Sequence, residues 1–460
     1  MLNAALRHAA SSRKRYVAEL SRLVAVPSCS FPGFPRAELN RSAKAVADLF
    51  RRAGLQHVQM LSIGEAPPYV YADWLHAPGK PTVLLYAHHD VQPVGDEDKW
   101  KSPPYRAEER KGRLYGRGAG DDKAGIIVHA ASIEAYLKTA GRLPLNVKLL
   151  IEGEEEVGSD NQPAFLKRYA KLLSADVLVI ADSGNFETGL PSMTTSLRGL
   201  VAADVTVSSC AQSLHSGMWG GPIPDPVLAL SKMLATLIDG KGLIAIRGMY
   251  DDVRPLNKIE KESYASLRYG DALYRKQAGM LGGVEVIGGK ASAPEKLWRL
   301  PSISVNAIQA SSRKDCANII NASAWCRVGI RTVPDMSEEK AFRLLAAHLE
   351  ARAPWGVKVE IVKSTSGHWW GTDPSDEVFQ AARRALSKGY GKKAVYIGTG
   401  GSIPFVGPFS KALGGAPALL IGVEDPYSAA HSENESVDLG DLQKAILSSV
   451  HLYGELAALE

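Results

Sequence analysis

The sequence predicts an α/β protein of two domains, in which a small α+β domain interrupts a larger one. Three observations predict this architecture. Apolar runs alternate with helical stretches over the first 195 residues, a pattern of half-exposed strands follows, and the α/β pattern returns near the end. At 460 residues the chain also exceeds the size at which a single core stops growing. We therefore expect a first domain over 1–195, an inserted domain over 196–365 and the remainder of the first domain over 366–460.

The first part of the chain alternates between the two kinds of element. Residues at helical spacing predict helices, and short apolar runs rich in β-branched residues predict strands. The expected helices are 13–24, 43–53, 124–137 and 164–173, and the expected strands are 81–87, 145–151 and 175–181. Strands that alternate with helices usually lie parallel in a sheet that the helices cover.

The middle of the chain has a different pattern. Expected strands at 199–207, 324–333 and 357–362 accompany expected helices at 226–237 and 337–352, and a less regular stretch covers 245–300. Ser337 followed by two glutamates is typical of a helix start. A helix at 375–387 and a strand at 416–422 then restore the α/β pattern. These elements predict the inserted α+β domain.

Composition excludes several classes of protein. Hydrophobic residues make up 45% and charged residues 22%, and the net charge is only +5 with dispersed Lys and Arg, unlike the basic face of a nucleic-acid binder. The four cysteines (Cys29, Cys210, Cys316 and Cys326) have no CxxC spacing. The pattern of the first thirty residues does not indicate secretion, and no apolar run approaches the ~18 residues of a membrane span. We expect a cytoplasmic protein with reduced thiols and with neither nucleic acid nor membrane as a partner.

Metal-seeking side chains follow three of the expected strands. His88 follows the strand at 81–87, Glu155 and Glu156 follow the strand at 145–151, and Asp182 follows the strand at 175–181. Sites in open α/β sheets form outside the carboxyl ends of the strands. The sequence therefore predicts that these side chains meet at one edge of the sheet.

Two further segments add candidates of the same kind. Asp121 lies in Gly116-Arg-Gly-Ala-Gly-Asp-Asp-Lys, and His431 lies in Ala430-His-Ser-Glu-Asn-Glu. Considered alone, a segment of either kind is more often a turn or exposed surface than a metal site. A joint set of histidines and carboxylates without thiolates suits zinc or a similar divalent ion in a catalytic site. In the triplet Glu154-Glu-Glu156, one carboxylate could be a ligand and another a general base, and spacing alone does not decide which.

Together these segments resemble the M20 family of co-catalytic metallopeptidases, which includes carboxypeptidases, dipeptidases of the carnosinase type and amino-acid deacylases. The resemblance covers nearly the whole chain. The family pattern Glu-Glu-x-Gly-Ser selects the last two glutamates of the triplet. The resemblance implies that two metal ions, most simply Zn²⁺ with Mn²⁺ or Co²⁺ as alternatives, are held by His88, Asp121, Glu156, Asp182 and His431. Asp121 would bridge both ions.

The resemblance also implies roles around the metals. Glu155 would be the general base, and Asp90 would hold the ring of His88. The peptide bond between Asp121 and Asp122 would be strained or cis. His89 and Gly120 stand where other residues are common in the family.

The implied fold is a phosphorylase/hydrolase-like catalytic α/β domain with an inserted ferredoxin-like lid and dimerisation domain. The protein would be a homodimer. His215, in Ser213-Leu-His-Ser-Gly, resembles the histidine that reaches the active site of the other subunit, where it would stabilise the oxyanion. Packing within a glycine-bounded turn is the alternative for this residue.

Three further residues resemble positions that bind the substrate. Arg331 resembles the arginine that clamps the substrate carboxylate, for which a guanidinium fork suits better than an amine. His368, in Ser366-Gly-His-Trp-Trp, and Ser402, in Gly400-Gly-Ser-Ile-Pro, resemble substrate-site positions of the dipeptidase branch. For these two residues a purely structural role is an equal alternative.

The implied reaction is hydrolysis of an amide bond by metal-activated water. The segments around His215, Arg331 and Ser402 resemble the dipeptidase branch most, and Asp at 182, where the deacylase branches more often carry Glu, agrees. The resemblance therefore implies dipeptides or short peptides with a free C-terminal carboxylate as substrates, with N-acyl-amino-acid deacylation as the alternative. A non-catalytic, metal-stabilised dimeric binding protein is a third hypothesis, which the presence of Glu155 and of every ligand disfavours. A chelator separates these classes, because it would abolish hydrolysis in an enzyme and dimerisation in a scaffold.

Overall fold

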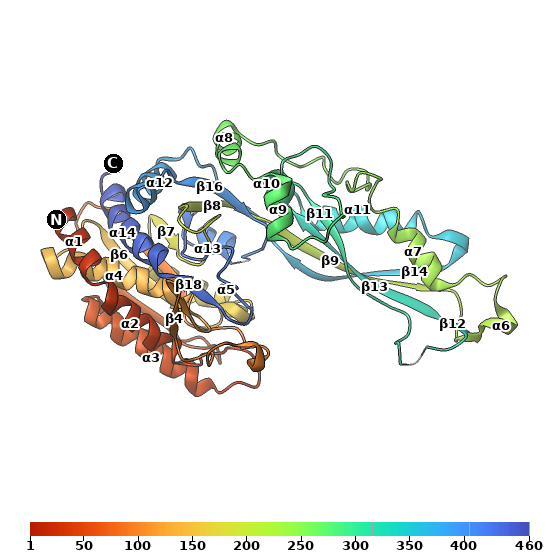
Figure 1. The fold of residues 1–460 in the computed structure, drawn as a ribbon, viewed down its shortest axis with the longest axis horizontal. Coiled ribbons are helices and arrows are strands. Elements are labelled where there is room, and N and C mark those ends of the chain that lie inside the picture. The colour runs from red at the N-terminus through yellow and green to blue at the C-terminus, as the bar shows by residue number, and fades with distance from the viewer. Residues whose placement is uncertain (315, 404, 460) are drawn as a thin grey trace. The chain divides into compact units, whose positions relative to one another are not determined.

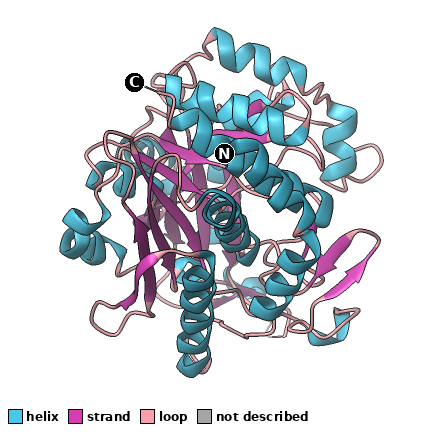
Figure 2. Cartoon of the chain, turned by 90° about the vertical axis from the view of Figure 1, so that its left-hand side faces the viewer, coloured by secondary structure: helices cyan, strands magenta, loops and turns pink. Residues whose placement is uncertain are grey.

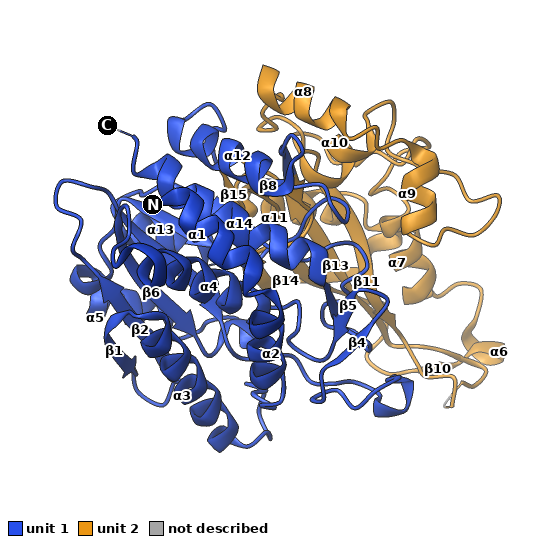
Figure 3. Cartoon of the chain, turned by 60° about the vertical axis from the view of Figure 1, so that its left-hand side comes forward, with its two compact units in different colours: residues 1–195, 372–397, 405–460 blue, residues 196–371, 398–404 orange. Residues whose placement is uncertain are grey.

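The computed structural model describes residues 1–314, 316–403 and 405–459, and the chain divides into two units, coloured separately in Figure 3. Unit 1 comprises Met1–Thr195, Thr372–Ile397 and Phe405–Glu460, and unit 2 comprises Ser196–Gly371 and Gly398–Pro404. The domain limits at 195 and 365 remain predictions.

A nine-stranded mixed sheet runs through unit 1 (Figure 1). Its strands are β1 (Gln56–Leu61), β2 (Tyr69–Trp74), β3 (Thr82–His88), β6 (Asn146–Glu152), β7 (Val177–Ile180), β8 (Ser192–Leu197), β15 (Trp370–Gly371), β16 (Val395–Thr399) and β17 (Ala418–Leu420). Their order is β1-β2-β6-β3-β7-β17-β8-β15, with β16 also beside β8. β15 and the ends of β8 and β16 fall within unit 2.

The centre of this sheet is parallel, as the alternation of strands and helices predicts. β3 pairs in parallel with β6 and with β7, and β7 pairs in parallel with β17. In this register His88 lies opposite Glu152, and Tyr86 lies opposite Ile180. The carboxyl ends of the central strands therefore reach one edge together, and the segments that follow them start side by side.

Helices cover the sheet of unit 1, as the cyan ribbons around the magenta strands show in Figure 2. They are α1 (Leu2–Ser11), α2 (Arg13–Val24), α3 (Arg36–Ala53), α4 (Lys123–Ala140), α5 (Gln162–Leu173), α12 (Glu377–Tyr390), α13 (Val406–Ala412) and α14 (Leu439–Leu456). α4 contacts α1, α2, α3, α14 and β3, so it is buried over most of its length. α13 and α5 contact each other and bring aromatic rings against Tyr86 and Tyr69.

A second, small sheet of unit 1 lies beside the loops that carry the candidate residues. Its strands are β4 (Glu108–Arg110), β5 (Arg113–Tyr115) and β18 (Ser436–Asp438), in the order β18-β5-β4. Because β18 pairs with β5, the loop that contains His431 is fixed at its end to the segment that precedes Asp121.

Unit 2 contains an antiparallel sheet of four strands. They are β9 (Gly199–Ser208), β11 (Ser302–Gln309), β13 (Ser323–Thr332) and β14 (Lys358–Gly367), in the order β11-β13-β9-β14. α7 (Pro226–Leu234) and α11 (Glu338–Glu350) pack on β9 and β13, and Val205, Leu230, Val328 and Leu345 belong to the core. The chain order β9-α7-β11-β13-α11-β14 is ferredoxin-like, as expected.

The remaining elements of unit 2 are short. They are β10 (Leu214–His215), β12 (Ile319–Ile320), α6 (Ser216–Trp219), α8 (Lys258–Ser266), α9 (Asp271–Gln277) and α10 (Ala293–Trp298). α8, α9 and α10 occupy much of the stretch 245–300 that the sequence leaves irregular. Within the described residues, no helix combines the length and apolar character that crossing a membrane requires.

Candidate metal centre

The candidate ligands of unit 1 start from the ends of neighbouring strands. His88 is the last residue of β3, Asp182 lies two residues beyond β7, and Glu155 and Glu156 belong to a short 3₁₀ turn that follows β6. Asp121 lies in the loop directly before α4. The parallel register of β6, β3 and β7 therefore places the three segments that follow these strands together.

Asp121 is shared by two groups of potential ligands. Its Oδ1 lies 2.9 Å from His88 Nε2, and the same nitrogen lies 3.8 Å from Asp182 Oδ1. Its Oδ2 lies 2.9 Å from His431 Nε2, which in turn lies 3.2 Å from Glu156 Oε2. Each group offers one histidine and two carboxylates whose ligand atoms lie within 4.8 Å of one another. One carboxylate thus presents one oxygen to each group.

Burial and mutual repulsion act on the carboxyl groups of this cluster. Burial, with the neighbouring Asp121 and Glu156 carboxylates, raises the pKa of Asp182 to about 7. Burial, with the charge of Asp182, raises the pKa of Glu155 well above its usual value. Hydrogen bonds to Asp121 and Glu156 raise the pKa of His431 to about 11. The cluster thus favours bound positive charge.

The donor set fits a pair of divalent cations. Imidazole nitrogens and carboxylate oxygens are good ligands for zinc and related ions, and three protein ligands per ion leave room for water and substrate. A cation in each group would also relieve the repulsion between Asp182, Asp121 and Glu156, because a metal ion reverses the local effect on carboxyl pKa values.

Asp90 connects the first histidine to the loop of the glutamates. His88 Nδ1 donates to the Asp90 carbonyl oxygen at 3.1 Å, and the Asp90 carboxylate lies 3.4 Å from the same nitrogen. That carboxylate accepts the N–H groups of Glu155 at 3.3 Å and Glu156 at 3.1 Å, and the hydroxyl of Ser30 at 2.6 Å. Asp90 therefore fixes both the ring of His88 and the backbone of the Glu155–Glu156 turn.

Glu435 holds the loop of Asp121, a role that sequence reasoning missed. Its Oε1 accepts the N–H groups of Gly120 at 2.9 Å and Asp121 at 3.1 Å, and its Oε2 accepts the N–H of Gly118 at 2.9 Å. Arg117 forms a buried ion pair with it at 2.7 Å. One feature of the sequence indicated this role, namely the position of Glu435 in the same short segment as His431. The contacts themselves could not be predicted, because they join residues more than 300 positions apart.

Glu424 is a second carboxyl group that sequence reasoning missed. Burial raises its pKa well above the usual value, and the charges of Asp121 and Asp182 raise it further. Glu424 follows β17, the strand parallel to β7. His88 and Asp182 were selected because they follow expected strands at the edge where sites form in α/β sheets. Glu424 follows the expected strand at 416–422 in the same way, so the same argument would have selected it.

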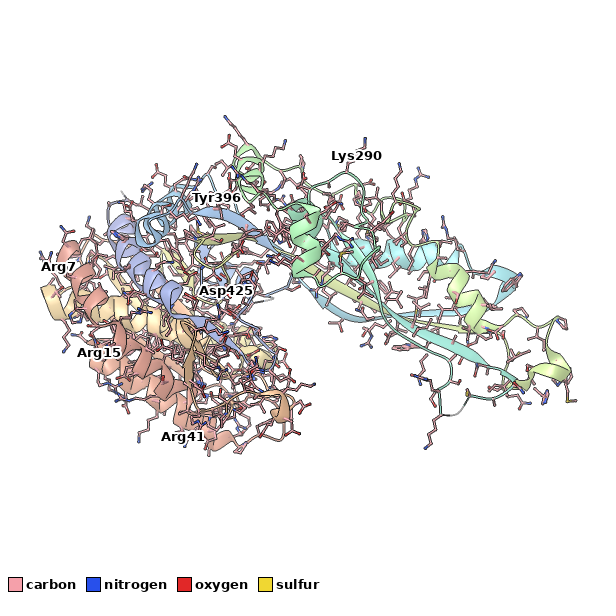
Figure 4. The ribbon with its side chains drawn as sticks, in the orientation of Figure 1. Arg7, Arg15, Arg41, Lys290, Tyr396 and Asp425 are labelled. Atoms are coloured by element: carbon pink, nitrogen blue, oxygen red, sulfur yellow. The ribbon has the colours of Figure 1, made fainter. Side chains whose placement is uncertain are left out.

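An ion pair fixes the start of the loop that carries His431. Asp425, labelled in Figure 4, accepts hydrogen bonds from Arg113 at 2.7 and 3.0 Å and from the Thr188 hydroxyl at 2.5 Å. Arg113 also bonds the hydroxyl of Ser436 at the far end of the same loop, at 2.9 Å. A single guanidinium therefore holds both ends of the segment around His431.

One of the two positions where the sequence departs from the family pattern has a structural explanation. His89 is buried, and its Nε2 bonds the carbonyl oxygen of Pro68 at 2.9 Å rather than joining the cluster. At Gly120 a Cβ would lie 3.4 Å from the carbonyl oxygen of Ser436, an ordinary contact distance, so the structure gives no steric reason for glycine there. The peptide bond between Asp121 and Asp122 is cis, which confirms the expectation for this bond.

The four other predicted site residues belong to unit 2. Arg331 Nη1 donates to the Ser402 hydroxyl at 3.1 Å, so these two residues lie together. His368 Nδ1 lies 3.3 Å from Glu338 Oε2, and the His368 side chain is 78% exposed. His215 is exposed at the end of β10, and its Nδ1 accepts the N–H of Gly217 at 3.1 Å.

The sequence of this chain is similar to a family of peptidases and to individual dipeptidases. A model of the peptidase family M20/M25/M40 matches residues 84–453. The chain is 30% identical to the Cys-Gly metallodipeptidase DUG1 of Candida albicans, over 96% of this chain and 95% of that protein. It is 33% identical to the cysteinylglycine-S-conjugate dipeptidase of Corynebacterium striatum, over 80% of this chain and 79% of that protein.

A solved structure shares the fold. The crystal structure of human carnosine dipeptidase 1 aligns with a TM-score of 0.81 and 27% sequence identity, over 100% of this chain and 99% of that chain. The mixed α/β sheet and the separate antiparallel sheet are therefore common to both proteins.

Proposed function

This chain belongs to peptidase family M20/M25/M40 and is a metallodipeptidase, and on that premise we propose that it hydrolyses dipeptides or short peptides with a free C-terminal carboxylate. The observation that carries the proposal is the Asp121 carboxylate, which two ligand groups share. Burial raises the pKa of the nearby Glu155, which lies close enough to Asp182, Glu156 and Asp121 for their charges to raise it further. The names of the Cys-Gly and carnosine dipeptidases support a dipeptide as the substrate.

The proposed cofactor is a pair of divalent ions, most simply Zn²⁺, with Mn²⁺ or Co²⁺ as alternatives. His88, Asp121 and Asp182 would hold one ion, and Asp121, Glu156 and His431 would hold the other. When bound, such ions lower the pKa of water and polarise the scissile carbonyl group.

Glu155 is the proposed general base. Its carboxylate accepts no hydrogen bond from the described residues, whereas its backbone N–H is fixed by Asp90. The carboxylate takes the proton of the attacking water and then delivers it to the leaving nitrogen. A pKa raised by burial suits the step in which Glu155 retains the proton.

Arg331 is proposed to bind the C-terminal carboxylate of the substrate, and Ser402 is proposed to lie at the same site beside it. The guanidinium offers a planar fork of donors, and its bond to the Ser402 hydroxyl fixes one nitrogen in place. His368 is proposed to line the same substrate site. Its contact with Glu338 would then orient the ring.

His215 is proposed to stabilise the oxyanion from the other subunit of a homodimer. Because its Nδ1 accepts the Gly217 N–H, a neutral ring carries its proton on Nε2, which makes that nitrogen a donor. Met218 and Trp219, in the following helix α6, are 75% and 52% exposed. Two large apolar side chains beside an exposed histidine support a protein partner at this surface.

The experiment that tests the function is a hydrolysis panel on protein stripped with a chelator. Cys-Gly, carnosine and a series of N-acetyl amino acids are incubated with and without added Zn²⁺ or Mn²⁺, and products are measured by mass spectrometry. We expect metal-dependent cleavage of dipeptides. Cleavage of only the acetylated amino acids would replace the proposal with deacylation, and metal-dependent dimerisation without cleavage of any compound would favour a binding protein.

A further inference from the structure

Arg198 is a buried cation of unit 2 without an acidic partner. It follows β8, is 8% exposed, and donates to the Gly400 carbonyl oxygen at 3.3 Å and to the Ser302 hydroxyl at 3.1 Å. Its third acceptor is the Leu300 carbonyl oxygen at 3.5 Å. All three acceptors are neutral, and no carboxylate forms an ion pair with this guanidinium among the described residues.

The other buried arginines of the described chain are paired with glutamates. Arg117 pairs with Glu435, and Arg299 pairs with Glu260. Buried charges are normally compensated in this way, because removing a charge from water is costly. Arg198 is therefore an exception that points to a negative group supplied from outside the chain.

A second guanidinium adds positive charge beside Arg198. The Ser402 hydroxyl donates to the Arg198 carbonyl oxygen at 2.6 Å and accepts a hydrogen bond from Arg331. Burial and the charge of Arg331 lower the pKa of Arg198 to about 10. A bound anion would relieve both the burial of Arg198 and its repulsion by Arg331.

Arg198 lines a pocket of about 330 Å³ that is formed entirely by unit 2. Ser302 and Lys296 contribute polar groups, whereas Met280, Ile287 and Leu297 contribute apolar walls. This volume lies near the lower end of the range for small-molecule sites, and apolar walls with a few polar groups are their usual composition.

The charges of the pocket set the charge of its ligand. Arg198 and Lys296 contribute two positive charges, and the exposed Glu285 contributes one negative charge. The surplus of one positive charge matches a monoanion. Arg198 Nη2 donates to no acceptor among the described residues, so it is available to the ligand.

We propose that this pocket binds a small monocarboxylic acid with an apolar chain. The carboxylate accepts hydrogen bonds from Arg198 Nη2 and from Lys296, and the chain lies against Leu297, Ile287 and Met280. The site requires neither metal ions nor Glu155, so it goes beyond the proposed peptidase reaction.

The test uses 4-methylpentanoate and its uncharged analogue 4-methylpentanamide as probes, with chelator-treated protein and isothermal titration calorimetry. Neither probe depends on the metal centre, so the result is independent of whether the protein cleaves dipeptides. We expect the carboxylate to bind at least about tenfold more tightly than the amide. Equal affinities, or no binding of the carboxylate at millimolar concentration, would overturn the proposal.

Four variants locate the bound carboxylate. Arg198→Gln should weaken binding by about tenfold or more, since it removes the charged donor. Leu297→Trp should abolish binding by filling the pocket, and it tests the proposal even if Arg198→Gln fails to fold. Glu155→Gln should bind as the unaltered protein does. If Arg331→Gln abolishes binding while Arg198→Gln and Leu297→Trp retain it, the carboxylate lies at Arg331 and the proposed pocket is wrong.

Discussion

Glu154 and Glu155 are neighbours in the sequence with different surroundings. Glu154 accepts the Tyr69 hydroxyl at 2.6 Å and the side-chain amide of Asn161 at 2.8 Å. The Glu155 carboxylate has no such partner among the described residues. The first glutamate is therefore held by the protein, whereas the second is free to exchange a proton with water.

We predict that Glu155→Gln lowers kcat by about 10²–10⁴-fold while the protein keeps its metal, because the amide cannot accept the proton of the attacking water. Glu154→Gln is the matched control and should change kcat by less than about threefold, because an amide oxygen still accepts the Tyr69 hydroxyl. Steady-state kinetics and metal analysis of both variants check this. Near-normal turnover in Glu155→Gln would remove it as the base.

Glu435 should matter mainly for stability and metal affinity. Glu435→Gln leaves the buried Arg117 uncompensated, so we expect a loss of about 3–5 kcal/mol in the free energy of unfolding and weaker metal binding. Urea unfolding and competition with a chelator measure the two effects. Glu433→Gln is the control, because Glu433 lies in the same loop but is only partly buried and its carboxylate accepts the Asp96 N–H, which an amide oxygen can still accept. Equal stability of the two variants would contradict this role for Glu435.

At the scale of residues, sequence motifs predicted which side chains would meet. His88, Asp121, Glu156, Asp182 and His431 could be selected because their short segments carry recognisable neighbours. The support from Glu435 could not be predicted in this way, since it acts through backbone N–H groups that any sequence offers. Contacts of this kind become visible only when distant loops are placed in space.

At the scale of elements, α4 is the clearest case of a helix defined by burial. Both its apolar residues and several polar ones are buried, and His129 on this helix bonds the Tyr86 carbonyl oxygen of β3 at 3.0 Å. Burial lowers the pKa of His129 to about 4. The folded protein therefore keeps this ring neutral at pH values where the unfolded chain would protonate it.

We predict that acid destabilises the protein partly through His129. Above pH 6.5 the ring is neutral in both states, and its contribution to stability is complete. As the pH falls from 6.5 to about 4, only the unfolded state gains the proton, which costs on the order of 3 kcal/mol in stability. Urea unfolding of chelator-treated protein across this range should show a weaker pH dependence for His129→Gln than for the exposed control His76→Gln. Identical pH dependence in the two variants would contradict the prediction.

Apolar runs identified part of the buried sheet of unit 1 and missed the rest, including β2 and β8, whose residues are all buried. The buried central strands β3, β6 and β7 were identified from their apolar runs. The strand β11 was also missed, although Ser302 to Ala307 alternate between polar and apolar residues, and its residues from Ser304 onward are exposed. Pairing with β13 along one side, rather than burial of its side chains, makes β11 a strand.

At the scale of the whole molecule, the proposed dimer has a direct test. His215→Ala keeps the metal ligands and Glu155, whereas Glu155→Gln keeps His215. If the histidine acts on the other subunit, mixing the two inactive variants under exchange conditions should restore about a quarter of normal activity, because half of the random dimers have one complete site. Activity that stays at the level of the separate variants would contradict action between subunits.

The points at which the chain leaves and re-enters unit 1 have a consequence for engineering. Thr195 and Thr372 bound the long insertion, and the Thr372 N–H donates to the Thr195 carbonyl oxygen at 3.0 Å. Because the two residues are already adjacent, a short turn could replace residues 196–371 with little loop-closure entropy. Residues 196–371 could therefore be deleted, or replaced by another domain, at this junction. The residues of both ligand groups lie outside this range and would remain in the chain.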